Sequence, residues 1–324
     1  MTEVRFLKAV NQALHDAMRD DPTVIMIGED IAAAGGSFKA TKGLLETYGP
    51  SRVYDAPIAE ATIAGIAVGA ALTGARPVAE IMFMDFVTLT MDMLVNQAAK
   101  ARSMFGGQGS VPMVLRTPHG GGLSAGPQHS QCLEAWFAHI PGLKVVVPAT
   151  PADAYGLLRA AIEDPDPVIV VENKALYAIK GDLPEVPERV AIGKGRIARA
   201  GRDATVVAYG ATVAMALEAA QQLAGEGLEI EVVDLRSIQP WDEALVLESL
   251  GRTHRLVVAH EAVEAFGVGA EIVARMADVG FDELDAPIVR VAAPFAPVPF
   301  SPVLEKHYRP TGQDIVAALR RVCA

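Results

Sequence analysis

The run Val24-Ile25-Met26-Ile27-Gly28 is apolar up to a terminal glycine, and it follows a segment, residues 4–19, whose apolar residues repeat at helical spacing. The run predicts a short strand buried on both faces, and the preceding segment predicts an amphipathic helix. The alternation continues with a helical pattern over 85–104 and with strand patterns over 111–115, 145–147 and 168–171. Strands that alternate with helices in this way predict a parallel sheet covered by helices.

A polar stretch punctuated by prolines interrupts this alternation at 181–188, and a second set of elements follows it. Strand patterns occupy 204–208, 230–233 and 256–259, and helical patterns occupy 212–223, 242–250 and 268–276. We therefore predict an α/β protein of two domains. A parallel-sheet domain would cover 1–185, a linker 186–200 and a smaller α/β domain 201–324.

Composition narrows the classes of protein to which this chain can belong. Its 324 residues are 51% hydrophobic, which is enough to fill the cores of about two domains. The net charge is −11, and lysine and arginine form no cluster. Neither nucleic acid nor an anionic membrane is therefore expected as a partner.

The cysteines and the longest apolar run bear on the compartment. Cys132 and Cys323 lie far apart without any metal-binding or redox spacing, which predicts unpaired thiols in a reducing compartment. The longest apolar run, 61–72, is shorter than the roughly 20 residues that a membrane span requires. We expect a cytoplasmic protein.

Glu60 is the one ionisable residue in the stretch 56–72. A lone carboxylate in so apolar a setting either has a raised pKa or holds a partner, and both are marks of a functional site. Pro57 followed by an acid in the next turn is also typical of a helix start, because an acid complements the helix dipole there. The residues alone leave both interpretations open.

A glycine-rich segment, 117–131, lies between a strand pattern and the helical pattern 132–139. We expect it to form a loop at the carboxyl edge of the sheet, where parallel α/β folds bind ligands. His129 in this loop could exchange protons near neutral pH, or it could cap the following helix. The segment lacks the Gly-Lys-Ser/Thr of a phosphate loop, and no histidines have the His-Glu-x-x-His spacing, so metal catalysis by this chain alone is not expected.

Seven stretches, in order along nearly the whole chain, resemble the beta subunit of the thiamine-diphosphate-dependent 2-oxo acid dehydrogenase complexes. They are Tyr54-Asp55-Ala56-Pro57-Ile58-Ala59-Glu60, residues 76–86, Asn96-Gln97-Ala98-Ala99-Lys100, Gln128-His129-Ser130-Gln131, residues 141–146, Asp234-Leu235-Arg236-Ser237-Ile238 and Leu284-Asp285-Ala286-Pro287. The resemblance implies a transketolase-like pyrimidine-binding domain followed by a smaller domain similar to the transketolase C-terminal domain, which would contact other subunits and the core of the complex. Residues 104–107 and 293–305 are most similar to the acetoin-cleaving branch. Pyruvate-type beta subunits are close to it, and a branched-chain 2-oxo acid dehydrogenase is the alternative.

The resemblance implies roles for five residues. Glu60 would hydrogen-bond the aminopyrimidine nitrogen of thiamine diphosphate and promote its imino form, for which a desolvated carboxyl group is suited. Phe86 would stack on the pyrimidine ring, and Ile58 would also contact the cofactor. His129 would lie near the reacting carbon and stabilise an oxyanion or exchange protons, with Gln128 assisting it.

The resemblance also implies partners. Relatives hold the diphosphate through magnesium on a Gly-Asp-Gly motif, which this sequence lacks. An alpha subunit would therefore supply the magnesium and diphosphate site in a heterotetramer, and a lipoyl acyltransferase core would receive the product. The reaction would be cleavage of acetoin or decarboxylation of a 2-oxo acid such as pyruvate to a hydroxyethyl adduct, followed by reductive acylation of lipoamide.

Two further features bear on ions and on substrate preference. Ala161, Ile162, Asp164 and Asp166 match a segment that binds potassium in some relatives, largely through carbonyl oxygens, although this stretch also reads as a plain turn. Relatives commonly have glycine where this chain has Thr62. The bulk of Thr62 beside the pocket could alter its geometry or its preferred substrate.

The sequence is compatible with two other functions. A non-catalytic assembly subunit that bridges an enzyme to the acyltransferase core would need no working pocket, and Glu60 would then serve only as a helix-start acid. A self-sufficient transketolase-type homodimer would need the diphosphate motif that is missing. Turnover by a Glu60→Gln variant paired with the alpha chain tests the first alternative, and cofactor binding by this chain alone tests the second.

Overall fold

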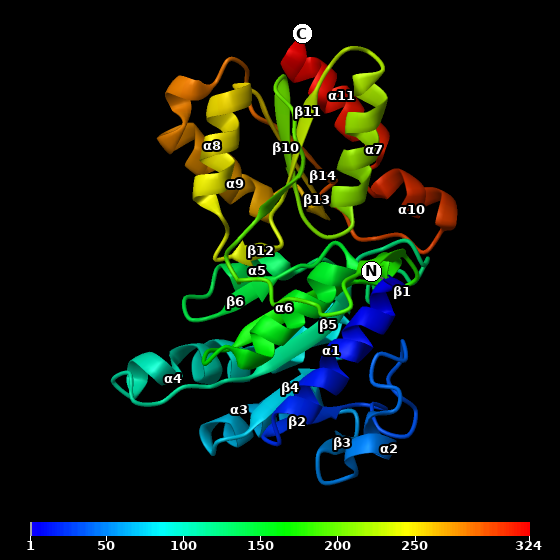
Figure 1. Cartoon of the computed structure of the whole chain (residues 1–324), viewed down its shortest axis with the longest axis vertical. Helices are drawn as coiled ribbons and strands as arrows, with labels where there is room; N and C mark the ends of the chain where they lie inside the picture. The colour runs from blue at the N-terminus through cyan, green and yellow to red at the C-terminus, as the bar shows by residue number, and fades with distance from the viewer. Residues whose placement is uncertain (1) are drawn as a thin grey trace. The chain divides into compact units, whose positions relative to one another are not determined.

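The computed structural model describes residues 2–324, which form two compact units (Figure 1). Unit 1 comprises the chain up to His119 together with Trp136–Ile192, and unit 2 comprises Gly120–Ala135 together with Gly193–Ala324. The chain therefore leaves unit 1 at His119 and returns to it after Ala135. The sequence patterns placed this excursion, the glycine-rich segment, in the first domain.

A parallel sheet forms the core of unit 1. Its strands are β2 (Val24–Gly28), β3 (Val53–Asp55), β4 (Arg76–Glu80), β5 (Val114–His119), β6 (Lys144–Val146) and β7 (Val168–Asn173). They lie in the order β6-β7-β5-β4-β2-β3, and every neighbouring pair in this order is parallel. The predicted parallel sheet is confirmed, and its carboxyl edge brings together the ends of β2, β4, β5 and β7.

Helices accompany this sheet in the order expected for strand–helix alternation. They are α1 (Phe6–Asp20), α2 (Leu44–Tyr48), α3 (Glu60–Leu72), α4 (Ala99–Met104), α5 (Glu134–Ala138), α6 (Pro151–Glu163) and the 3₁₀-helix η3 (Lys174–Leu176). α1 packs against α6 and buries Phe6, Val10 and Leu14 on one face. The predicted start of α1 is displaced because β1 (Thr2–Arg5) pairs antiparallel with β8 (Lys180–Leu183).

The segment predicted as one long helix over 85–104 is divided into three kinds of helix. A 3₁₀-helix, η1 (Met84–Thr90), is followed by a π-helix, η2 (Asp92–Ala98), and then by α4. The hydroxyls of Thr88 and Thr90 donate to the carbonyls of Asp85 and Val87, three residues earlier, at 2.9 and 2.7 Å. Such side-chain bonds compete with the regular α-helical ladder, and irregular helices of this kind are common beside functional sites.

Unit 2 has a sheet of its own, in the strand order β14-β13-β10-β11-β9. Its strands are β9 (Arg196–Arg199), β10 (Ala204–Ala208), β11 (Ile230–Asp234), β13 (Leu256–Val263) and β14 (Val289–Ala293), and β9 alone among them pairs antiparallel. Helices α7 (Thr212–Ala224) and α11 (Gly312–Cys323) lie on one side of the sheet, and α8 (Glu243–Thr253) and α9 (Val268–Val279) lie on the other (Figure 1). β12 (Ser237–Gln239), η4 (Phe281–Glu283) and α10 (Pro302–Tyr308) complete the unit. The predicted second α/β domain is confirmed.

None of the helices within residues 2–324 combines the length and the apolar character that crossing a lipid bilayer requires. The longest, α1, has 15 residues, and Lys8, Asp16 and Arg19 interrupt its apolar positions.

Candidate functional site

Glu60 is the first residue of α3 and is buried, with 6% of the residue exposed. The loop that leads to it from β3 is fixed by a hydrogen bond of 2.8 Å from the Ala56 N–H to the Gly28 carbonyl. Ala59, at the cap position, makes no side-chain capping bond. The Glu60 carboxyl group is the acid of the first helical turn, where it complements the helix dipole. Glu60 is therefore a helix-start acid that is also buried. A capping role does not require burial, so its burial favours an additional role.

A second acid, Glu29, lies beside Glu60 at the carboxyl edge of the sheet. It follows Gly28, the last residue of β2, and 8% of it is exposed. Burial raises the pKa of Glu29, and the nearby Glu60 carboxylate raises this pKa further. A hydrogen bond with the Ala59 backbone lowers the pKa but does not cancel these two effects. Within residues 2–324, its Oε1 atom has no hydrogen-bond partner. A buried acid with a raised pKa and a free oxygen favours its protonated form more than an exposed glutamate does.

Glu29 is not among the site residues predicted from the sequence, although one signal indicates it. An acid directly after a buried parallel strand that ends in glycine lies at the edge where α/β folds bind ligands. Its pairing with Glu60 could not be read from the sequence, because the two residues come from different strand–helix connections.

Phe86 lies in η1, which packs against α3, and it is half-buried. Its ring meets Phe83 edge to face, with centroids 6.0 Å apart and planes at 85°. Phe83 meets Phe38 in the same manner at 5.8 Å, and Phe38 in turn lies 5.2 Å from Tyr177. This row of aromatic rings limits the orientations that Phe86 can adopt. The structure thus brings two of the predicted site residues, Glu60 and Phe86, onto packed elements of unit 1.

A charged network lies within the sheet next to these residues. Arg116 of β5 is 1% exposed; it contacts Glu80 of β4 through Nη1 and bonds Glu172 of β7 through Nε and Nη2 at 2.9 and 2.6 Å. Tyr177 donates its hydroxyl to Glu172 at 2.8 Å. Burial opposes the charge on Arg116, but Glu172 and Glu80 outweigh it and raise its pKa. Burial raises the pKa of Glu80 despite Arg116. The network joins the carboxyl ends of three strands.

Ile58 and Thr62 flank Glu60 in the sequence and both face solvent. Ile58, in the loop before α3, is 84% exposed, which is unusual for so large an apolar side chain. Thr62 is exposed on the first turn of α3, and its N–H bonds the Ala59 carbonyl at 2.9 Å. The helix therefore accommodates the β-branched residue without an irregularity.

Gln128 and His129 belong to the Gly120–Ala135 segment of unit 2. Gln128 is exposed and His129 is half-buried. The His129 N–H bonds the Gly126 carbonyl at 3.3 Å, so His129 lies in a turn and not in the following helix, α5. It does not cap that helix from an adjacent position, since α5 begins at Glu134.

The oxygen atoms of three of the four residues predicted to bind potassium lie against basic side chains. Nη1 of Arg76 donates to the carbonyl oxygens of Ile162 at 2.8 Å and of Asp164 at 3.2 Å. Nζ of Lys144 contacts both carboxylate oxygens of Asp164 at 2.7 Å and lies 3.9 Å from Asp166. Fixed cations therefore satisfy the oxygens of these three residues, and the carbonyl of the fourth, Ala161, accepts the Asp164 N–H at 3.3 Å. Potassium binding stays a prediction that this arrangement does not favour.

The two units, a parallel-sheet unit and a second α/β unit, match the two domains of transketolase-like proteins. Residues 2–180 match the family model described as the transketolase pyrimidine binding domain, and residues 193–315 match that of the transketolase C-terminal domain. A solved chain described as a split gene transketolase, inactive beta4 tetramer, has the same fold with a TM-score of 0.80. It is 26% identical, and the match covers 99% of this chain and 98% of that chain.

Curated relatives narrow the class. The chain is 49% identical to the acetoin:2,6-dichlorophenolindophenol oxidoreductase subunit beta of Bacillus subtilis, over 95% of this chain and 94% of that protein. It is 45% identical to the mitochondrial pyruvate dehydrogenase E1 component subunit beta-2 of Oryza sativa, over 99% of this chain and 86% of that protein. The chain belongs to the family of transketolase-like beta subunits of the thiamine-diphosphate-dependent 2-oxo acid and acetoin dehydrogenases.

Proposed function

We propose that unit 1 binds the aminopyrimidine end of thiamine diphosphate, with Glu60 as the acid that holds a proton at the ring nitrogen. The observation that carries this proposal is the burial of Glu60 beside a second acid of raised pKa. An aminopyrimidine nitrogen is a weak base, and a carboxyl group held away from water has a proton affinity closer to that of such a base than an exposed carboxyl group has. The free Oε1 of Glu29 and the half-buried ring of Phe86 fit such a ligand.

Glu29 lies beside Glu60 and supports its role. Burial and the neighbouring Glu60 carboxylate both raise the pKa of Glu29, so the protonated form of Glu29 is favoured relative to that of an exposed glutamate. In this proposal the Glu60 carboxyl group hydrogen-bonds the ring nitrogen, and Glu29 provides a second acid beside it. Once bound, thiamine diphosphate supplies the carbon nucleophile and the electron sink for C–C cleavage.

Phe86 and Ile58 orient the ring. Phe86, held edge to face by Phe83, offers a ring of fixed orientation for stacking. Ile58 is exposed at the start of α3, where a bound ring would cover part of its side chain. Both contacts would orient the aminopyrimidine ring, and neither residue takes part in proton transfer.

His129 and Gln128 act at the reacting carbon in this proposal. A half-buried histidine can donate a hydrogen bond to a developing oxyanion or take up a proton during acyl transfer. Gln128, exposed beside it, can donate through its amide.

The beta-subunit relationship implies an alpha partner, and we propose a heterotetramer in which that partner supplies the magnesium and the diphosphate site. The absence of Gly-Asp-Gly from the sequence supports this division. The substrate would be acetoin or pyruvate, with a lipoyl acyltransferase core as the acceptor. The two relatives described above are named for these two substrates.

Turnover by a Glu60→Gln variant tests the proposal. The variant and the wild type, each reconstituted with the alpha subunit, are assayed with acetoin, pyruvate and a branched-chain 2-oxo acid and an artificial electron acceptor. We expect turnover of the preferred substrate to fall by about 100-fold or more, because loss of a positioned acid–base group has this effect. Glu46→Gln, which changes an exposed acid in the first turn of α2, is the matched control and should retain full turnover. Wild-type turnover by Glu60→Gln would instead favour a non-catalytic assembly subunit.

A further inference from the structure

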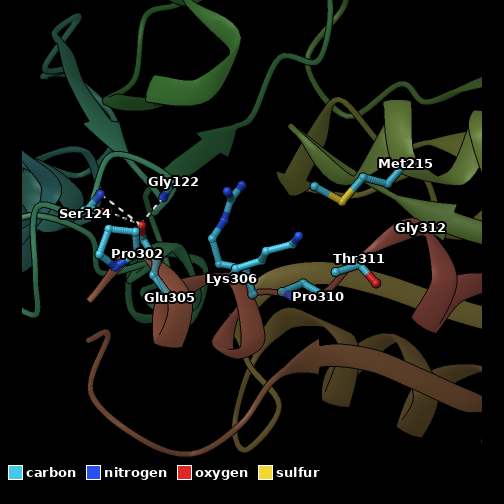
Figure 2. A pocket seen from close by; sticks show the side chains of 10 residues that line it. Gly122, Ser124, Met215, Pro302, Glu305, Lys306, Pro310, Thr311 and Gly312 are labelled. Atoms are coloured by element: carbon cyan, nitrogen blue, oxygen red, sulfur yellow. Dashed lines mark hydrogen bonds between the residues drawn. The ribbon is translucent and has the colours of Figure 1, made fainter. Parts of the chain in front are cut away.

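Two buried carboxylates hold the glycine-rich segment within unit 2. Glu305 of α10, 4% exposed, accepts hydrogen bonds from the Gly122 N–H at 2.7 Å and from the Ser124 N–H at 2.9 Å, shown as dashed lines in Figure 2. Glu261 of β13 accepts one from the Gly121 N–H at 2.8 Å and another from Nε of Arg309 at 3.1 Å. Neighbouring backbone N–H groups that point toward negatively charged oxygens form an anion-binding nest. Here the anions are side chains of the same unit.

The backbone of this segment has a conformation that needs such support. Gly120, Gly122 and Gly126 have φ values of +86°, +98° and +78°, and Ser124, which has a side chain, has a φ of +54°. A non-glycine residue in this left-handed region is strained unless its surroundings hold it there. The Ser124 hydroxyl adds a third bond to Glu305, at 3.2 Å.

The glycines also let the 300–309 stretch approach closely. A Cβ atom on Gly122 would lie 2.5 Å from Nη1 of Arg309, and one on Gly126 would lie 2.2 Å from the ring of Phe300. Side chains at these positions would displace Arg309 or Phe300, so the glycines allow the segment and this stretch to lie close together.

Packing does not fix the segment on all sides. A cavity of about 350 Å³ borders Gly122, Ser124, Glu305 and Lys306 (Figure 2). Because open space adjoins the segment there, its hydrogen bonds to Glu305 are the contacts that fix it on this face.

We propose that Glu305 is a positioning residue for His129. By fixing the backbone at Gly122 and Ser124, it sets the place at which the same segment presents His129, whose turn begins at Gly126. The inference rests on the proposed function of His129 and names a residue that this function needs. Glu305 acts through the segment and is not itself a catalytic residue.

The experiment compares Glu305→Gln, His129→Ala and the double variant in the reconstituted alpha–beta enzyme. Glutamine keeps the shape of the side chain but replaces one accepting oxygen with an amide donor, so it can serve only one of the two N–H groups. We expect kcat to fall by about ten- to a hundred-fold, since a small misplacement of a reacting group has this effect. The dissociation constant for thiamine diphosphate should not change. Glu271→Gln, an exposed first-turn acid of α9, is the control for Glu305→Gln.

The double variant separates positioning from general stability. If Glu305 acts through His129, Glu305→Gln lowers kcat no further in the His129→Ala background, whereas an independent structural effect lowers kcat by the same factor in both backgrounds and overturns the inference. If kcat falls in His129→Ala but is unchanged in Glu305→Gln, the inference about Glu305 is overturned while the proposed role of His129 stands. Wild-type kcat for His129→Ala overturns the proposed role of His129 and the inference with it.

Ser124→Ala keeps the test decisive if Glu305→Gln folds poorly, and hydrogen exchange adds a structural readout if it folds. Ser124→Ala removes only the hydroxyl bond to Glu305 and should show a smaller loss of kcat with the same lack of additivity. Hydrogen exchange at the amides of Gly122 and Ser124 should be faster in Glu305→Gln than in Glu271→Gln, because these amides lose a charged acceptor. Unchanged exchange at both amides would contradict the inference.

Discussion

The Glu60 carboxylate, at the start of α3, raises the pKa of Glu29, at the end of β2, beyond the increase that burial alone causes. The two acids come from neighbouring connections of a parallel sheet and meet at its carboxyl edge. Burial and the nearby negative charge both favour the protonated form of Glu29. A second buried acid beside Glu60 supports a role for Glu60 beyond that of a helix-start residue.

The pairing predicts that Glu29 destabilises the folded chain at neutral pH. A raised pKa means that the folded state binds the proton more tightly than the unfolded state, whose glutamate has a pKa of about 4.5. The stability that protonated Glu29 contributes is therefore fully present below pH 4.5 and is lost as the pH rises through the folded-state pKa. We expect Glu29→Gln to raise the melting temperature at pH 8 by a few degrees, and the gain to shrink toward pH 4.5.

Scanning calorimetry of the two proteins across this range measures the effect. Glu46→Gln, at an exposed position, is the control and should leave the melting temperature unchanged at every pH. A gain that does not vary with pH would mean that burial and Glu60 do not perturb Glu29.

Phe86 should contribute to cofactor affinity and little to folding. Replacing it with leucine removes a stacking contact worth about 0.5–1.5 kcal/mol, so we expect the dissociation constant for thiamine diphosphate to rise by about two- to ten-fold. The measurement is a fluorescence titration of the reconstituted pair with the cofactor. Phe281→Leu, at a position that is 70% exposed in unit 2, is the control. Equal affinities for the two variants would exclude Phe86 from the binding site.

Arg116 should be required for the stability of unit 1. Methionine at this position leaves Glu80 and Glu172 buried without a counter-charge, which costs about 3–5 kcal/mol in comparable networks. We expect this loss in urea unfolding followed by circular dichroism. Lys180→Ala breaks the exposed ion pair with Glu3, whose side chains are 59% and 60% exposed, and should cost no more than about 1 kcal/mol. Similar losses in both variants would show that the buried network is not a stabilising element.

Tyr308 should affect how the stability of the folded chain falls at alkaline pH. Burial, with smaller contributions from Cys132 and Glu261, raises its pKa to about 12 from an ordinary value of 10.0. The folded state keeps the phenolic proton that the unfolded chain releases, so this contribution to stability is complete below pH 10 and disappears as the pH approaches 12. Tyr308→Phe should therefore lose less stability than the wild type between these two pH values. Thermal unfolding curves at several pH values provide the comparison. Tyr54→Phe, at an exposed position, is the control. Equal losses of stability in Tyr308→Phe and the wild type would refute the prediction.

The sequence predicted those parts of the fold whose signal is local. The strands at Val24–Gly28 and Ala204–Ala208 are continuous apolar runs, and the structure has them with the predicted bounds. β5 was predicted too early, because it continues through Arg116 and Thr117, which look like loop residues until Glu80 and Glu172 are known to surround the arginine.

The residues of the candidate site also differ in whether a local sequence signal could identify them. Glu60 could be singled out because it is the one ionisable residue in the stretch 56–72, whereas the importance of Glu29 depends on a tertiary contact. Glu305 is 183 residues from Gly122 along the chain, so no local pattern could link the two. The glycine-rich segment was recognised as unusual, but the carboxylates that it binds were not predictable from its own residues.

The central claim is that Glu60 holds a proton at the ring nitrogen of a cofactor shared with an alpha subunit. A crystal structure of the reconstituted alpha–beta pair with thiamine diphosphate and magnesium tests it most directly, through the distance from the Glu60 carboxyl group to that nitrogen. We predict a hydrogen bond of about 2.6–3.2 Å, with the diphosphate and the metal on the alpha chain. A ring bound elsewhere, with the Glu60 carboxyl group facing solvent, would contradict the claim.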